Sequence, residues 1–255
     1  MNFDPSLPID SASASINTTV GVFTRVLSMA GRTANVSAQF PIVSGHVEGN
    51  YLGAPAQADR FGQADPRLRV AINLYGAPSM DARAFSKYQL RTVVGTSLTV
   101  APPLGQYDPV KLINIGANRW SFKSELGVSH ALRGPWVVEG MFGVWWFTRN
   151  DEFGGTGTRT QDPILGTQVH LTYVFKGVRR KMWLAADANF YRGGQTTVNG
   201  TINADLQQNS RVGATYSVGL TRRQALRASF SRGAVTRIGG DFTTIAVGYS
   251  YAWLQ

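Results

Sequence analysis

The chain contains no cysteine, which excludes a disulfide framework and any thiol chemistry. Charged residues make up only 16% of its 255 residues. It also lacks any run of about 18 consecutive apolar residues, so a transmembrane helix is not expected. These absences leave room for a β-barrel in a membrane, because the apolar and polar faces of its strands alternate and average out. The mean hydropathy is accordingly near zero (−0.11).

Positive charge exceeds negative charge, with a formal net charge of +10. The basic residues do not cluster on a helix but fall at regular strand positions or in short turns, such as Arg179, Arg180 and Arg222. This distribution disfavours nucleic acid as a partner, although the net charge alone would permit it. The first residues, Met1 to Pro5, are neither basic nor apolar and do not form a secretory signal.

The dominant pattern is an alternation of apolar and polar residues with a period of two. In residues 67–74, Leu68 and Val70 point one way and Arg67 and Arg69 the other. Eleven such segments follow one another with no helical period between them, and most have the length of about ten residues that a tilted strand needs to cross a bilayer. They are 16–26, 34–42, 67–74, 94–100, 120–128, 136–146, 165–175, 184–190, 212–220, 226–230 and 245–253. The pattern predicts an all-β fold, an antiparallel transmembrane β-barrel of the outer-membrane type.

Short and long connections alternate along the chain, as in outer-membrane barrels, where the short turns are periplasmic. The short ones are 30–33, 131–135, 176–181 and 221–224, and the long polar loops are 48–65, 102–118, 149–163, 193–209 and 233–240. One connection on the short side is longer, and Ser79 could cap a small helix there that runs to Tyr88.

Aromatic residues gather near the strand ends, where barrels place their interface girdles; the alternative is the aromatic core of a soluble sandwich. They are Trp120, Trp136, Trp146, Trp183, Tyr249, Tyr251 and Trp253. The last strand is similar to the C-terminal aromatic signal of outer-membrane barrels. We therefore expect the barrel-assembly machinery, outer-membrane lipid and lipopolysaccharide as partners.

The strand count is odd. If the C-terminus lies in the periplasm, eleven strands place the start of the first one, near Ser11, outside the cell. Bacterial single-chain barrels have even numbers of strands with both ends periplasmic. We therefore expect residues 1–255 to form a single β-barrel domain that lacks its signal peptide and first strand, with about 12 strands when complete.

The stretch from Ala101 to Trp120 resembles the family of outer-membrane transporters associated with the meta-pathway of phenol degradation. Further matching stretches are 143–147, 150–151, 161–163, 206–211, 239–242 and 251–253. The resemblance covers nearly the whole chain. It implies a channel in the bacterial outer membrane for passive uptake of small hydrophobic or aromatic compounds. Two alternatives are a structural outer-membrane barrel with a closed lumen and a soluble all-β binding protein.

Catalysis has little support. The histidines are His46, His130 and His170, without metal-ligand spacing. His170, Asp187 and Ser217 are predicted to point inward, but nothing in the sequence brings them together as a triad. We expect no enzymatic activity, no cofactor and no metal.

The predicted lumen face is mainly basic. It holds Arg25, Arg67, Arg69, Asn73, Arg91, Arg119, Lys123, Arg211 and Arg227, offset by Glu125, Glu139 and Asp187, together with His170. Either these residues form a basic constriction that favours anionic solutes, or they form a ladder of salt bridges filling a narrow barrel. The loop within 101–120 is the candidate for a pore-narrowing or substrate-engaging segment, or for an ordered cap on the rim. Its candidate residues are Gly105, Tyr107, Asp108, Asn114 and Asn118.

Overall fold

The computed structural model describes residues 9–80, 88, 91–111, 113–178, 180–238 and 241–253. Within these ranges the chain forms strands, turns and loops, and no helix is long and apolar enough to cross a membrane. The strands are β1 (Ile9–Met29), β2 (Arg32–Tyr51), β3 (Ala54–Gln63), β4 (Arg67–Tyr75), β5 (Thr92–Ala101), β6 (Ser121–Ala131), β7 (Trp136–Phe147), β8 (Asn150–Phe153), β9 (Gly157–Gln161), β10 (Ile164–Val174), β11 (Met182–Gly193), β12 (Thr196–Val198), β13 (Thr201–Ile202), β14 (Gln207–Gly219), β15 (Gln224–Val235) and β16 (Thr244–Tyr251).

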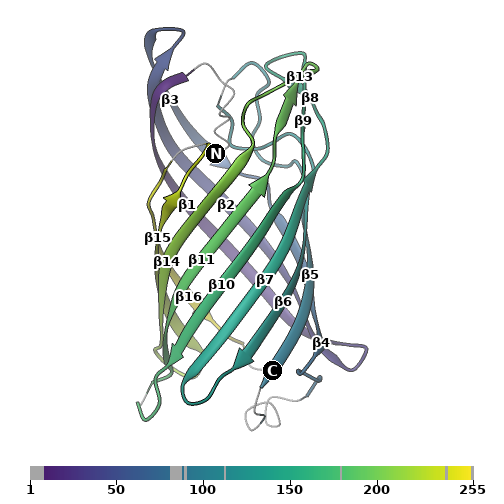
Figure 1. Cartoon of the computed structure of the whole chain (residues 1–255), viewed down its shortest axis with the longest axis vertical. Helices are drawn as coiled ribbons and strands as arrows, with labels where there is room; N and C mark the ends of the chain where they lie inside the picture. Colours follow the sequence, from purple (N-terminus) through teal and green to yellow (C-terminus); the bar gives the residue numbers. More distant parts are fainter. Residues whose placement is uncertain are drawn as a thin grey trace.

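Eleven antiparallel strands form the main wall, in the order β1-β2-β4-β5-β6-β7-β10-β11-β14-β15-β16. The sheet curls into a barrel-shaped wall of tilted strands (Figure 1). Each strand expected from the alternating pattern is present, so the predicted all-β, outer-membrane-type fold is confirmed. The order follows the chain because each strand pairs with the next through a hairpin-like connection.

Three segments expected to be loops contain strands. β3 pairs with the distal part of β2, and β8, β9, β12 and β13 form a separate four-stranded sheet. These strands lie at one end of the wall, at the top of Figure 1. Segments 48–65, 149–163 and 193–209, predicted as long polar loops, therefore contain strands that the sequence pattern did not predict. Their strands escape the pattern because they lack sustained apolar alternation.

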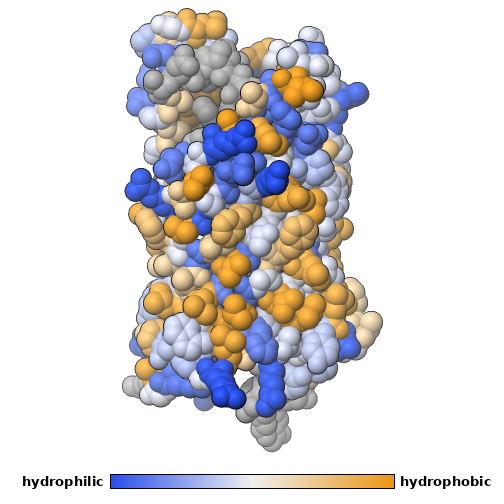
Figure 2. Space-filling view, viewed as in Figure 1, coloured by the Kyte–Doolittle hydropathy of each residue, from blue (hydrophilic) through white to orange (hydrophobic). Residues whose placement is uncertain are grey.

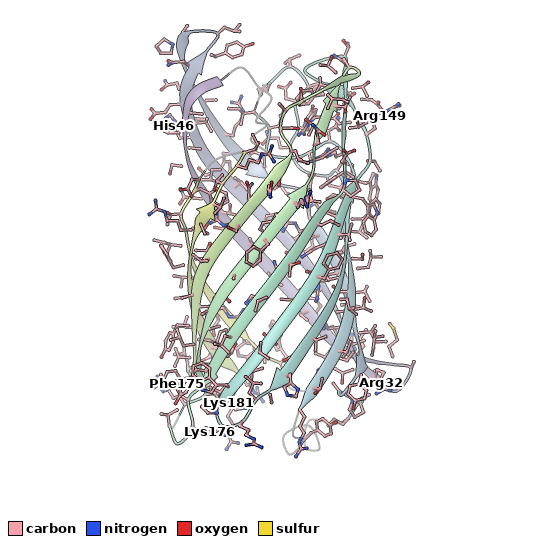
Figure 3. All side chains as sticks on the ribbon, viewed as in Figure 1. Arg32, His46, Arg149, Phe175, Lys176 and Lys181 are labelled. Carbon is pink, nitrogen blue, oxygen red and sulfur yellow. The ribbon has the colours of Figure 1, made fainter. Side chains whose placement is uncertain are left out.

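The two ends of the wall differ in their connections. Tight turns close one end, which we call the short-turn end; Ala30 and Gly31 both have positive φ angles (49° and 71°), as a type I′ hairpin requires. Arg32 and Lys176 are labelled at this end in Figure 3, whereas His46 and Arg149 lie at the opposite, long-loop end. Most of the small helix expected between Ser79 and Tyr88 falls outside the described residues.

The two faces of the wall differ in polarity, as β6 illustrates. Leu126 and Val128 are 51% and 43% exposed on the outer face. The side chains of Lys123 and Glu125, on the inner face, are only 17% and 13% exposed. On the face in view, Figure 2 shows a hydrophobic band across the middle of the wall, with strongly hydrophilic patches above and below it. Alternation along every strand produces this band without any continuous apolar segment.

The first and last strands of the wall, β1 and β16, both run from the long-loop end to the short-turn end, because they are the first and the eleventh of eleven successive antiparallel strands. Within the described residues no pairing joins these two strands. Two strands that run in the same direction do not continue an antiparallel ladder. The expected additional strand between them stays a prediction.

Replacing Leu126 with Lys should destabilise the barrel by about 2–4 kcal/mol, because a lysine near the bilayer midplane on the lipid face loses its hydration. Ser129→Lys, on the inner face of the same strand, is the matched control and should cost far less. Unfolding by denaturant in lipid vesicles measures both variants. Equal costs for the two lysines would contradict the assignment of the outer face to lipid.

Candidate functional site

A cluster of charged and aromatic side chains occupies the inner face toward the long-loop end of β4 to β7. Glu125 forms an ion pair with Lys123, and Arg69 Nε lies 4.0 Å from Glu125 Oε2. Ser97 Oγ donates to the same Oε2 atom at 3.3 Å. The ammonium of Lys123 also lies 4.1 Å from the centre of the Trp145 ring. We call Arg69, Lys123, Glu125 and Trp145 the lumen cluster.

Strand register explains why these side chains meet. Lys123 is paired with Thr99 on one side and Trp145 on the other, and Glu125 is paired with Ser97. Glycines provide the space: a Cβ atom on Gly143 would lie 3.1 Å from Glu125 Cγ. At Gly166, a Cβ atom would lie 2.5 Å from the Trp145 ring. The side chains of Glu125 and Trp145 therefore occupy the space above Gly143 and Gly166, where the neighbouring strands have no side chain.

A cavity of about 310 Å³ adjoins the lumen cluster. Its lining includes the predicted lumen residues Arg69, Asn73, Glu125 and Glu139, together with Asn35, Ala71, Gly95, Ser97, Gly127, Ser129 and Met141. Several of these side chains are small or absent, which leaves the space unfilled. The cavity combines amides, hydroxyls and carboxylates with apolar lining from Ile72, Val93, Val128 and Met141.

A second polar network lies nearer the short-turn end. His170 Nδ1 is 2.5 Å from Asp187 Oδ1, and Thr215 Oγ1 donates to Asp187 Oδ2 at 2.9 Å. The structure thus joins His170 and Asp187, a contact that the sequence did not indicate. The hydroxyl that binds Asp187 belongs to Thr215 and not to Ser217, the residue considered from the sequence as the third member of a triad. Register makes this contact, because His170 and Asp187 are directly paired on β10 and β11.

The remaining predicted lumen residues do not join the lumen cluster. Arg119 is buried, bonded to Gln161 and stacked 4.4 Å from the Phe147 ring centre. Arg211 donates to Phe242 O at 3.0 Å and so holds the segment that leads into β16. The others are exposed, namely Arg25, Arg67, Arg91 and Arg227.

The 102–118 loop is fastened to the connection between β3 and β4. Both oxygens of Asp65 accept backbone N–H groups from the loop, at 2.8 Å from Gly105 and 2.8 Å from Ala117. Glycine is needed at position 105, because a Cβ atom there would lie only 2.6 Å from the backbone nitrogen of Asp65. Arg60 Nε donates to Ile113 O at 2.8 Å, and the Ile113 side chain is buried.

The opposite side of the loop is fastened to β8. Tyr107 donates its hydroxyl to Glu152 O at 3.1 Å and accepts from Asn150 Nδ2 at 3.1 Å. Asn118 Nδ2 donates to Asn150 Oδ1 and to Glu152 Oε2, both at 3.0 Å. The loop therefore spans the rim from the β3–β4 connection to the β8 strand.

Inside the loop, Asp108 and Asn114 stabilise the turn. Asn114 Oδ1 accepts from Asp108 N at 2.9 Å, and Asn114 Nδ2 donates to Asp108 O at 3.0 Å. The ammonium of Lys111 and the backbone N–H of Val110 bind the Asp108 carboxylate and hold its pKa below the ordinary value. These two residues therefore shape the loop from within.

Sequence reasoning missed the aromatic part of the lumen. Trp145 and Tyr191 make an edge-to-face contact with ring centres 6.1 Å apart on the inner face. Trp145 directly precedes Trp146, so the alternation could have placed one tryptophan inward and the other outward. The residues predicted to face the lumen are charged or polar, and none of them is phenylalanine, tyrosine or tryptophan.

Three comparisons with known proteins place the chain. The crystal structure of an outer membrane channel from Pseudomonas putida F1 matches it with a TM-score of 0.73 and 21% identity, covering 92% of this chain and 83% of that chain. The comparison with curated proteins finds no match. Residues 8–245 match the family described as "Putative MetA-pathway of phenol degradation". With nearly its whole length matched, the chain belongs to this family.

Proposed function

We propose that this protein is a channel in the bacterial outer membrane that takes up small hydrophobic or aromatic compounds by passive diffusion. The observation that carries the proposal is the cavity of about 310 Å³ on the inner face, next to the ammonium–indole contact of Lys123 and Trp145. A cavity of about 150 Å³ holds one benzene molecule, so a single aromatic ring with polar substituents fits. The fold of the matched channel and the phenol-degradation family support the same proposal.

The lumen cluster favours a ring that carries a polar or anionic group. The ring would stack beside Trp145, while a hydroxyl or carboxylate would approach Lys123 or Arg69. Each of these cations already faces Glu125, so their net attraction for an anion is partial. We therefore propose that phenols pass at least as readily as aromatic acids.

Solute flux tests this function. Purified protein in planar bilayers should give discrete conductance steps, and vesicles that contain it should admit benzoate faster than protein-free vesicles. Toluene crosses phospholipid bilayers unaided, so vesicles cannot test its uptake. Its uptake is therefore compared in cells with and without the gene, because the lipopolysaccharide leaflet of their outer membrane slows apolar solutes. Arg69→Gln should lower the flux of benzoate relative to phenol, whereas Arg67→Gln, outside the lumen cluster, should leave the ratio unchanged.

A closed structural barrel is the second candidate, favoured by two observations. The charges of the lumen cluster are mutually paired, and the 102–118 loop is fastened across the rim. The absence of conductance, together with normal uptake in cells that lack the gene, would support this candidate and reject the channel.

A further inference from the structure

The outer wall carries a hollow that the channel function does not use. It measures about 430 Å³ and lies across β7, β10, β11, β14 and β15 toward the long-loop end. The lining consists of Phe142, Leu165, Thr167, Phe190, Tyr191, Arg192, Gln208, Asn209, Ser210 and Val235. None of these described lining residues is acidic.

Strand register produces the hollow. Phe142, Thr167 and Phe190 are paired in one row across β7, β10 and β11. The row continues through Ser210 on β14 to Val235 on β15. The small side chains of Thr167 and Ser210 therefore lie between bulky apolar ones. All five residues are on the outer face, so the hollow opens away from the lumen.

Two arginines stand at the edge of the hollow nearer the long-loop end. Arg192 is the register partner of Gln208, and Arg237 Nη1 donates to Gln208 Oε1 at 3.1 Å. Asn209 Oδ1 accepts from the backbone N–H of Arg237 at 2.8 Å and so fixes the position of this residue. Both arginine side chains are exposed. Two guanidinium groups thus flank one glutamine directly beyond an apolar recess.

We infer that this hollow binds an acylated, phosphate-bearing glycolipid of the outer leaflet, with an acyl chain over Phe142, Phe190 and Val235 and a phosphate on Arg192 and Arg237. Guanidinium groups suit phosphate because their planar donors pair with two oxygens at once. The position of the two arginines along the barrel also suits a lipid headgroup, because hydrophilic surface lies above the hydrophobic band on the face shown in Figure 2. The inference rests on the proposed location in the outer membrane.

Retention of lipid A by the purified protein tests the inference. Protein extracted from outer membranes in mild detergent is titrated with lipid A, and bound lipid is counted by native mass spectrometry. The double variant Arg192→Gln/Arg237→Gln should bind about thirtyfold more weakly, since each of the two basic side chains contributes about 1 kcal/mol near an anionic membrane surface and about 1.4 kcal/mol is tenfold in affinity. The matched control is Arg222→Gln/Arg223→Gln, at exposed positions in the short-turn connection between β14 and β15.

Two further arms separate the parts of the site. Ser210→Phe should fill the hollow and weaken binding without changing charge, and dephosphorylated lipid A should bind the wild-type protein more weakly. Equal binding by the two double arginine variants would overturn the inference, as would displacement of lipid A by inorganic phosphate alone. Conductance is recorded on the same preparations, so a working channel that ignores lipid A would refute only this inference. A non-conducting protein that binds lipid A would refute only the proposed channel.

Discussion

Replacing Glu125 with Gln should shift the lumen toward anion selectivity and destabilise the barrel. The substitution leaves Lys123 and Arg69 without the carboxylate that both face. Removing one partner of a buried ion pair costs about 3–5 kcal/mol, and here about 2 kcal/mol is expected, because Arg69 retains 35% exposure to solvent. Reversal potentials across a salt gradient measure the selectivity, and denaturant unfolding in vesicles measures the free energy.

Glu139→Gln is the matched control. It removes the same charge from the lining of the same cavity, and Glu139 has no ion pair among the described residues. If both variants changed selectivity and stability equally, the specific pairing in the lumen cluster would be refuted in favour of a general field effect. Adding Lys123→Met to Glu125→Gln should recover most of the original selectivity, because it removes one of the two uncompensated cations.

Replacing Asp65 with Ala should release the 102–118 loop from the rim. Hydrogen bonds to a charged group contribute about 1.5–3 kcal/mol each, so losing the bonds from Gly105 and Ala117 should cost the loop about 3 kcal/mol. Hydrogen exchange at these two amides should accelerate by about two orders of magnitude, while exchange in the main wall stays slow. Limited proteolysis within the loop gives a second readout.

The Asp65 variant also decides between the two roles expected for the loop. Larger conductance steps would show that the fastened loop narrows the pore, whereas unchanged steps would show that it only caps the rim. Asp59→Ala is the control, because Asp59 pairs with His46 on the same hairpin and does not hold the loop. Unchanged protection of Gly105 and Ala117 in the Asp65 variant would refute the fastening itself.

The candidate site was only partly predictable from sequence. Alternation placed Lys123 and Glu125 on the inner face, but their contacts with Arg69 and Trp145 depend on how four strands align. A shift of one residue between strands would turn every inner side chain outward, and a shift of two would exchange its neighbours. Alternation in the sequence specifies on which face of the wall a side chain lies, but it does not specify which side chains of neighbouring strands it contacts.

The β2–β3 hairpin is another feature that strand pairing decides and that alternation in the sequence does not predict. Its segment from Ala54 to Gln63 has little apolar alternation, so it was expected to be part of a loop. It is a strand because Leu52 and Gly53, both with positive φ, turn the chain back along β2. Backbone pairing beyond the hydrophobic band needs no apolar face.

The sequence alone determined the eleven wall strands, their order and the polarity of their two faces, because a period of two is a local property that burial in lipid imposes on each strand. The tertiary structure alone decided which inner side chains meet, how Asp65 holds the 102–118 loop, and where Arg192 and Arg237 flank a hollow on the outer wall. These features depend on register between strands and on contacts between segments far apart in the chain, and neither is encoded in the alternation of any single strand.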